Sequence, residues 1–306
     1  MRITELFDRG EFVVTAEVGP PKGIHVEHLV EEAKEYLSGI TAVNVTDNQS
    51  SVMRLGSLAT CKALKDAGLT PIFQLTCRDR NRIALQSDLL SAAMLGIDNV
   101  LCLTGDHTKM GDHPGAKPVF DLDSVSLLHT IGQLEKGVDL GGNELVGEPP
   151  KFAKGAVVSP CSDSVDAQLA KMERKVMAGA EYFQTQAVYE PEKFAEFMEK
   201  AKQSSPATLN KILDNVLPYV STSLDVEEMV AVLGEVGKYN IVGKDGFPFE
   251  QYRATGNLGS KGSCVIPVDL KANVIELHNF LFESEEYEIS SEVMSYSQKI
   301  SADTGR

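Results

Sequence analysis

Short apolar segments alternate along this chain with longer segments whose apolar residues recur at helical spacing. The apolar segments are rich in Val, Ile, Phe and Thr and are bounded by turn residues, which is typical of strands buried on both faces. The clearest strands are expected at residues 12–18, 41–46, 71–76 and 99–103. Amphipathic helices are expected between them, at residues 25–37, 55–67 and 82–95.

The alternation continues, less regularly, through the rest of the chain. Further strands are expected at residues 154–159, 181–188, 217–222 and 239–242, and further helices at residues 165–178, 191–202 and 271–282. Eight strand–helix units would close a barrel, whereas six units with an irregular tail would form an open sheet. We predict the closed form, a single (β/α)8 TIM barrel of the α/β class that spans residues 1–306.

Three longer segments interrupt the alternation and are expected to be loops, at residues 107–119, 137–152 and 246–267. The first follows the fourth predicted strand, at the end of the barrel where enzymes of this fold carry their active sites. Long loops without regular structure are usually functional or mobile, so residues 107–119 are a candidate part of a site.

The composition is that of an ordinary globular protein, with 42% hydrophobic and 24% charged residues. The 44 acidic side chains outnumber the 29 basic ones, and a net charge of −15 makes nucleic-acid binding unfavourable. We find neither an apolar run long enough to insert into a membrane nor a signal peptide. The five cysteines are scattered without a CxxC pair, which predicts a cytoplasmic protein with reduced thiols and no metal site of its own.

Two carboxylates at the ends of predicted strands are candidates for chemistry. Glu17 lies among apolar residues of the first strand, and partial desolvation would raise its pKa towards that of a general acid. Asp106 follows Gly105, which lets a ligand approach the backbone closely. Each also has an ordinary interpretation, Glu17 as a loop cap or an ion-pair partner of Lys22, and Asp106 as the start of a turn.

Polar side chains also gather at the ends of other predicted strands, and a barrel would bring them into one pocket. They are Thr46, Asp47, Asn48 and Gln49 after the second strand, Gln74, Thr76 and Cys77 at the third, and Gln184 and Gln186 on the sixth. Signatures of other chemistries are missing, since there is no GxGxxG after the first strand, no P-loop and no GxSxG. His107, Asp112 and His113 match no metal-binding spacing.

Several short stretches together make the sequence similar to the methylenetetrahydrofolate reductase family, whose members have a flavin-binding (β/α)8 barrel. The stretches are AEVGPP from Ala16, VNVT from Val43, QLTC from Gln74, LTGD from Leu103, ERKVMAGA from Glu173 and QTQ from Gln184. Their order and positions fit that family over about residues 10–200. The loop after LTGD most resembles the branch used in anaerobic one-carbon metabolism, in which a separate iron–sulfur protein can accompany the reductase.

The resemblance implies a reaction and the residues that perform it. The reaction is the reduction of 5,10-methylenetetrahydrofolate to 5-methyltetrahydrofolate by hydride transfer from a reduced flavin. Glu17 matches the general acid that protonates N10 of the folate, and Asp106 matches the residue that binds the pterin and tunes the flavin. Gln186 matches the glutamine that contacts the pterin.

The resemblance also implies how a cofactor is held. Thr46 matches a residue at the flavin ring, and Lys175 matches a basic residue near the flavin's phosphate or ribityl group. Gln74 stands where the family often has His and still offers a hydrogen bond. Three positions where relatives have other residues are occupied here by Thr104, Ser159 and Gln168. The expected cofactor is FAD. FMN is the alternative, because these replacements weaken the binding of the adenylate half of FAD.

Beyond about residue 205 we find no match, so residues 205–306 are expected to complete the barrel differently or to dock a partner. A self-sufficient reductase would take electrons from NAD(P)H. The alternative is a flavin- and pterin-binding subunit that receives electrons from an iron–sulfur partner. Both interpretations imply a folate ligand and a homo- or hetero-oligomer. A third, an unrelated barrel enzyme such as an aldolase, lacks a Schiff-base lysine at a strand end.

Overall fold

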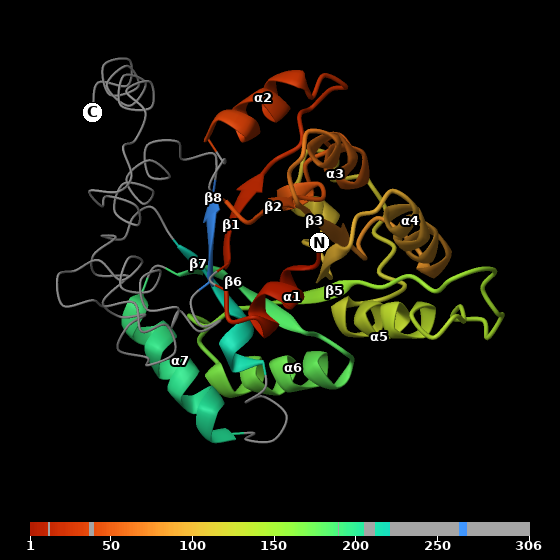
Figure 1. The fold of residues 1–306 in the computed structure, drawn as a ribbon. Helices are drawn as coiled ribbons and strands as arrows, with labels where there is room; N and C mark the ends of the chain where they lie inside the picture. Colours follow the sequence, from red (N-terminus) through yellow and green to blue (C-terminus); the bar gives the residue numbers. More distant parts are fainter. Residues whose placement is uncertain (12, 37–39, 189, 205–211, 221–262, 268–306) are drawn as a thin grey trace, which may run out of the picture.

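The computed structural model describes residues 1–11, 13–36, 40–188, 190–204, 212–220 and 263–267. Its parallel strands, β1 to β8, form a closed barrel in the order of the sequence, with helices around the outside (Figure 1). The strands are β1 Val13–Val18, β2 Ala42–Val45, β3 Pro71–Thr76, β4 Asn99–Leu103, β5 Ala153–Val158, β6 Tyr182–Val188, β7 Val216–Val220 and β8 Ser263–Pro267. This arrangement confirms the predicted (β/α)8 fold.

The helices follow the strands along the chain and pack against the outside of the barrel. They are α2 Glu27–Tyr36, α3 Ser57–Asp66, α4 Arg82–Met94, α5 Ser124–Leu134, α6 Val165–Met177 and α7 Pro191–Ser204. Three short turns, η1 Gln49–Ser51, η2 Thr108–Met110 and η3 Leu213–Asn215, and one helix before the barrel, α1 Ile3–Asp8, complete the described elements. Helices α1 and α5 were not predicted. Asp123 begins α5 through a capping box with Ser126, a local signal that was present in the sequence.

The prediction was wrong for β8, the strand that closes the barrel. β8 lies within residues 246–267, which we expected to form a loop, and it pairs with β1 from Val13↔Ser263 to Glu17↔Pro267. The predicted strand at residues 239–242 and the predicted helix at residues 271–282 lie outside the described residues. The segment SCVIP is too short and too close to glycine and proline to be identified alone, so its pairing with β1 defines it as a strand.

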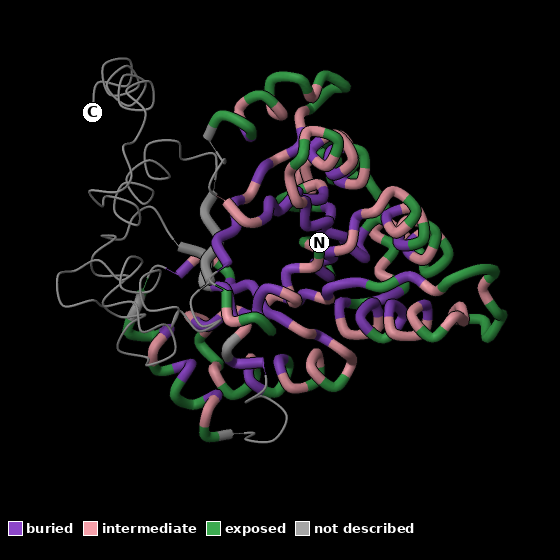
Figure 2. The backbone as a smooth tube through the Cα atoms, viewed as in Figure 1, coloured by how far each residue is buried: buried purple, intermediate pink, exposed green. Residues whose placement is uncertain are grey.

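Burial follows the two faces of each strand. Residues that point outwards pack beneath the helices in the main core, for example Val14, Val43, Phe73, Val100 and Phe183. Figure 2 shows the buried strands inside and the exposed faces of the helices outside. Because successive side chains of a strand point to opposite faces, the intervening residues point into the barrel.

Helix α1 closes the amino end of the barrel. Its side chains Ile3, Leu6 and Phe7 form a second buried cluster with residues near the starts of the strands. Those strand residues are Val13, Ala42, Ile72, Leu101, Ala153, Tyr182 and Leu217. The buried side chain of Asn99 fixes the start of the helix, since its Oδ1 accepts a hydrogen bond of 2.8 Å from the backbone N–H of Ile3. The amino end is therefore filled by apolar side chains.

None of the helices in the described ranges has the length and apolar character needed to cross a membrane. In the same ranges, no group of three or more His, Cys, Asp and Glu side chains gathers in a way that could hold a metal ion.

Candidate active site

The carboxyl end of the barrel opens into a cavity of 740 Å³, which is within the usual size range of small-molecule sites. All the residues that the resemblance assigned to a site line this cavity, namely Glu17, Thr46, Gln74, Asp106, Lys175 and Gln186. They come from β1, β3, β6, α6 and the turns after β2 and β4. Closure of the barrel brings these residues together, and their roles towards a ligand stay predictions.

Glu17 is partly buried at the end of β1, where two side-chain amides approach its carboxylate. Nε2 of Gln74 donates to Oε2 over 3.1 Å, and Nε2 of Gln49 donates to Oε1 over 3.5 Å. Gln74 is buried, with 6% of its surface exposed, so its amide is held firmly against Glu17. Lys22, considered as an alternative ion-pair partner of Glu17, has its ammonium against Asp112.

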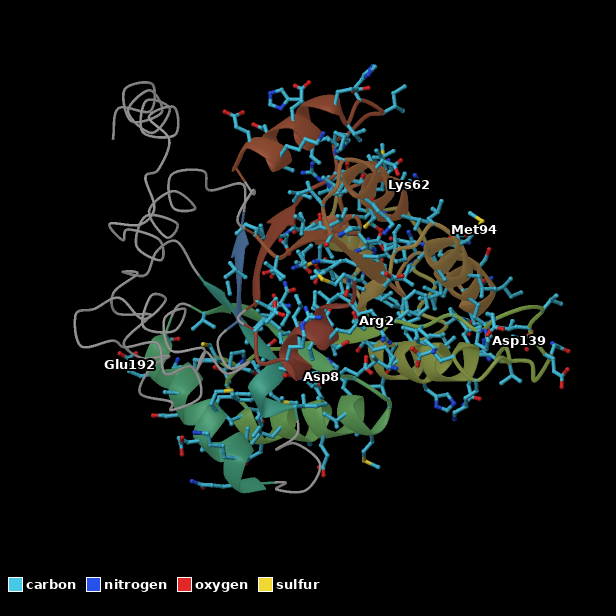
Figure 3. All side chains as sticks on the ribbon, viewed as in Figure 1. Arg2, Asp8, Lys62, Met94, Asp139 and Glu192 are labelled. Carbon is cyan, nitrogen blue, oxygen red and sulfur yellow. The ribbon has the colours of Figure 1, made fainter. Side chains whose placement is uncertain are left out.

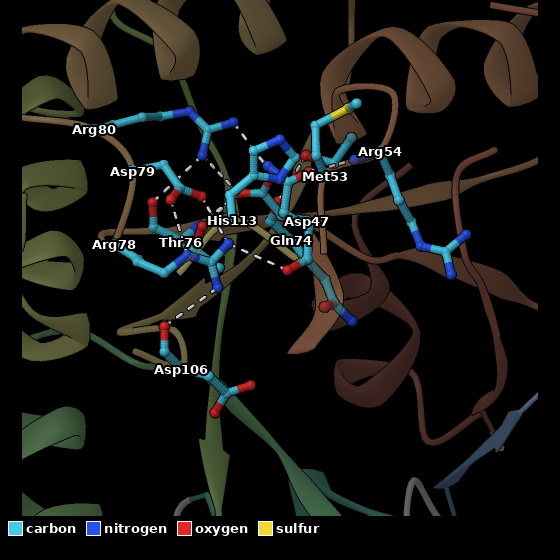
Figure 4. A network of polar contacts seen from close by, with 12 residues as sticks. Asp47, Met53, Arg54, Gln74, Thr76, Arg78, Asp79, Arg80, Asp106 and His113 are labelled. Carbon is cyan, nitrogen blue, oxygen red and sulfur yellow. Dashed lines mark hydrogen bonds and ion pairs between the residues drawn. The ribbon is translucent and has the colours of Figure 1, made fainter. Parts of the chain in front are cut away.

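Thr46 and Asp106 occupy the turns after β2 and β4 and differ in exposure. Thr46 is buried, and its hydroxyl lies 3.5 Å from the carbonyl oxygen of Val18. Asp106 is exposed, and its backbone carbonyl accepts a hydrogen bond of 3.4 Å from Nη1 of Arg78. Figure 4 shows the Asp106 carboxylate turned away from the neighbouring polar network. Its backbone is thus anchored while its carboxylate is presented to the cavity.

The glycine before Asp106 is required by the backbone. Gly105 has a φ of +90°, and a β-carbon there would lie 3.0 Å from Cβ of Arg78 and 3.3 Å from Cβ of Thr76. A side chain would therefore be strained by its conformation and crowded by its neighbours. Gly105 lets the turn that carries Asp106 lie directly against the end of β3.

Helix α6 contributes a positively charged wall. Lys171, Arg174 and Lys175 all line the cavity from this one helix. Nζ of Lys175 donates to the carbonyl oxygen of Val157 over 2.6 Å. Burial of the ammonium and the nearby charge of Lys171 lower the pKa of Lys175 to about 8. The wall is suited to an anionic group, which would stabilise the protonated lysine.

Strand β6 presents its glutamines at an irregularity in the sheet. The register between β6 and β7 shifts between Gln184 and Ala187, as in a β-bulge. Gln184 is buried and Gln186 is exposed, and both line the cavity. Bulges often re-aim side chains near sites, and this one leaves the Gln186 amide open to a ligand.

At one wall of the cavity lies a network of charged side chains whose two arginines, Arg78 and Arg80, our sequence analysis did not identify. The carboxylate of Asp47 is fully buried and accepts hydrogen bonds from Thr76, at 2.9 Å from its N–H and 2.8 Å from its hydroxyl. Nη1 of Arg80 lies 2.7 Å from Asp47 (Figure 4). Its Nε lies 2.8 Å from Asp88. Although burial opposes the charge of Arg80, these carboxylates outweigh it and raise the pKa of the guanidinium.

Arg78 joins this network to the turns that carry the candidate site residues. The side chain is 2% exposed and forms an ion pair of 2.7 Å with Asp79. It also donates to the carbonyl oxygens of Asn48 and Asp106, in the turns after β2 and β4. The sequence signal was the run RDR from Arg78, separated by one residue from the end of β3, where charged residues follow a buried strand. The three replaced family positions, Thr104, Ser159 and Gln168, also line the cavity.

Comparisons with known proteins identify relatives of this chain. A sequence model described as methylenetetrahydrofolate reductase matches residues 2–236, so the match extends past residue 205, beyond which the motifs of the sequence predicted none. The 5,10-methylenetetrahydrofolate reductase of Pectobacterium carotovorum subsp. carotovorum is 25% identical over 228 residues, 74% of this chain and 65% of the relative. That of Salmonella typhimurium strain LT2 is 25% identical over 213 residues, 69% and 66% of the two chains. The matched part is just under two thirds of the length of these relatives.

Solved structures show similar barrels at low sequence identity. An uncharacterized protein from Clostridium thermocellum that binds two copies of 5-methyl-5,6,7,8-tetrahydrofolic acid has a TM-score of 0.58 at 13% identity, covering 93% of this chain and all of its own. Tryptophan synthase from M. tuberculosis has a TM-score of 0.50 at 10% identity, covering 92% and 97% of the two chains. These likenesses concern the fold alone. Because the family match spans well over half of the sequence, this chain belongs to the methylenetetrahydrofolate reductase family.

Proposed function

We propose that this protein reduces 5,10-methylenetetrahydrofolate to 5-methyltetrahydrofolate with hydride from a reduced flavin. The observation that carries the proposal is the convergence of the family's motif residues on one cavity of a chain that belongs to the family. The names of its relatives describe reductases of 5,10-methylenetetrahydrofolate, and the similar barrel from C. thermocellum binds 5-methyl-5,6,7,8-tetrahydrofolic acid.

The residues of the cavity fit a flavin. The cations of α6 suit a phosphate, while amides and hydroxyls along the other walls can pair with the polar edge of a ring. In this proposal Lys175 holds the phosphate or ribityl side, and Thr46 and Gln74 lie at the ring. A bound flavin would supply the hydride, and the protein positions it and excludes water. FAD is the expected flavin. FMN is the alternative, because Gln168 and Ser159 change the residues that would bind the adenylate half of FAD.

Glu17 is proposed as the proton donor. When protonated, its carboxyl group can donate to N10 of the folate, and cleavage of the C–N bond then leaves an iminium carbon on N5 that can accept hydride. Asp106 is proposed to bind the pterin, because an exposed carboxylate can accept paired hydrogen bonds from the amino group and ring N–H of that ring. The exposed amide of Gln186 offers both a donor and an acceptor to the same ring.

The electron source divides two versions of the proposal. In the first version the protein oxidises NAD(P)H directly and is a complete reductase. In the second version it is a subunit whose flavin receives electrons from an iron–sulfur partner, in a homo- or hetero-oligomer.

The first test is the absorption spectrum of the purified protein, as isolated and after reconstitution with FAD or FMN, followed by anaerobic titration with NADH. A flavin spectrum that bleaches with NADH supports the complete reductase. One that bleaches only with dithionite or a cluster protein supports the subunit. Failure to bind either flavin would refute the proposal.

The second test is Glu17→Gln, which keeps the size of the side chain and removes its proton. The variant should bind flavin and accept electrons normally, but its folate turnover should fall by about 10²-fold or more, as is usual when a general acid is lost. The measurement is the rate at which methylenetetrahydrofolate reoxidises the reduced flavin. A near-normal rate would rule out Glu17 as the proton donor.

A further inference from the structure

The turn after β2 has a strained backbone. Three non-glycine residues there have positive φ angles, 46° at Asn48, 54° at Ser50 and 61° at Ser51. L-residues rarely adopt this left-handed region, and such conformations persist only where the surrounding structure imposes them. The turn also carries Gln49, whose amide approaches the carboxylate of Glu17. The contacts that hold the turn in this conformation therefore also place Gln49 beside Glu17.

Hydrogen bonds hold the first residue of the turn on two sides. Nη2 of Arg78 donates to the carbonyl oxygen of Asn48 over 3.2 Å. The N–H of Arg54 donates to Oδ1 of Asn48 over 2.9 Å, from the chain that leaves the turn. These bonds fix the start of the turn, and the N–H of Ser51 donates to the same Asn48 carbonyl oxygen over 2.9 Å. A further element packs against the far side of the turn, at Ser51.

That element is the loop after β4, residues 107–119. Gly111 packs so closely on the turn that a β-carbon there would lie 1.8 Å from the carbonyl oxygen of Ser51. The next residue, Asp112, accepts a hydrogen bond of 3.0 Å from the N–H of Met53 and one from the ammonium of Lys22. The contacts with Lys22 and His113 hold the pKa of Asp112 below its ordinary value.

We propose that Gln49 is a positioning residue for the carboxyl group of Glu17, and that Gly111 and Asp112 hold the turn that carries it. This inference deepens the proposed function and rests on it for the role of Glu17 as proton donor. In this proposal the loop after β4 supports the turn after β2, and that turn places Gln49 against Glu17 at the end of β1.

The chemistry of an amide explains why glutamine suits this position. A carboxyl group that donates a proton passes between a neutral and an ionised form. An amide can donate to the ionised form through Nε2 and, after rotating, accept from the neutral form through Oε1. Gln74 approaches one carboxylate oxygen and Gln49 the other, so both oxygens are oriented in both states. A lysine or arginine would instead favour the ionised form alone.

The test uses Gln49→Leu in the full-length chain, with the titration of Glu17 followed by NMR of ¹³C-labelled glutamate carboxyl groups. The Glu17 signal is assigned by its absence in Glu17→Gln. Removing an amide donor from the carboxylate should raise the pKa of Glu17 by about one pH unit and slow folate-dependent flavin reoxidation about tenfold. The other ionisable groups that line the cavity are unchanged in this variant, so the difference reports on Gln49. They are Asp47, Arg78, Cys102, Asp106, Asp123, Lys171, Arg174 and Lys175.

Variants of the loop test its part in the proposal. Gly111→Ala should raise the pKa of Glu17 as Gln49→Leu does, and Asp112→Asn, a milder change, should raise it less. Met110→Ala is the matched control, since this neighbouring side chain is 74% exposed and should leave the titration unchanged. An unchanged titration in Gln49→Leu would overturn the inference, and a shift in that variant without one in either loop variant would overturn the role of the loop. If the NMR shifts occur but wild-type protein does not turn over folate, the proposed function fails and the positioning contact stands.

Discussion

The two ends of this barrel are built from the same strands and differ in almost every physical respect. At the amino end, Ile3, Leu6 and Phe7 of α1 fill the interior with apolar side chains. At the carboxyl end, the interior is a 740 Å³ cavity with carboxylates, amides and cations on its walls. The closed end contributes stability by burying apolar surface, and the open end keeps polar groups available to a ligand.

The change from one end to the other can be followed along single strands. In β1 the inward positions are Val13, Thr15 and Glu17, and in β3 Ile72 is followed by Gln74 and Thr76. The outward positions between them stay apolar throughout and pack under the helices. Because these outward residues hold the strands to the surrounding core, the inward face can become polar towards the carboxyl end without loss of the fold. The comparison teaches that stability and chemistry are separated along the barrel axis.

The largest expected effect is on the closed end. Phe7→Ala should lower the free energy of unfolding by about 3–5 kcal/mol, the usual cost of removing a buried aromatic ring, as measured by urea denaturation. Flavin affinity in the absence of denaturant should be unchanged, because Phe7 packs against Tyr182 at the far end from the cavity. Met94→Ala is the control, since Met94 is 78% exposed on α4 (Figure 3) and should change stability little. A loss of flavin affinity equal to the loss of stability would break the comparison.

A smaller effect is expected at the buried Asp47–Arg80 pair, which contributes to stability and lies at the open end. Asp47→Asn keeps acceptors for Thr76 but removes the charge that pairs with Arg80, and should cost about 2–3 kcal/mol of unfolding free energy. Flavin affinity should fall as well, because Asp47 and Thr76 also line the cavity. Asp121→Asn is the control, since its pair with Arg82 is exposed and should matter little. Stability loss without any change in binding would show that the network serves the fold alone.

The smallest expected effect is confined to the open end. Lys175 has a pKa of about 8, so it is charged at pH 7 and mostly neutral at pH 9. An anionic flavin phosphate favours the charged form, so affinity should fall about tenfold as the pH rises from 7 to 9. Lys175→Met should bind more weakly at pH 7 and lose this pH dependence. Fluorescence titration at both pH values measures the effect. A pH dependence retained in the variant would assign it to another group.

Local patterns made much of the barrel predictable. The strands from β1 to β7 lie where apolar segments bounded by turn residues predicted them, because a strand buried on both faces has a distinctive composition. The two missed helices had weaker signals. Helix α1 has only 6 residues, and α5 stands between two loops that obscured the repeat.

Some residues of the candidate site were predictable from the sequence and others were not. Residues directly at strand ends, such as Glu17 and Gln186, were predictable because every strand end of a barrel faces one cavity. Arg78 and Arg80 were not identified, because their importance comes from buried partners distant in the sequence, among them Asp47 and the carbonyl of Asp106. A charged residue after a strand is ordinary until burial makes its pairing necessary.

By itself, the sequence determined the alternation of strands and helices, the fold class and the resemblance that located the polar strand ends, since each depends on composition and order over short distances. Only the tertiary structure decided that Ser263–Pro267 closes the barrel, that α1 plugs it, and that Gly111 presses on the strained turn that carries Gln49. These contacts join segments far apart in the chain. Their energies come from pairing and burial that exist only once the barrel has closed.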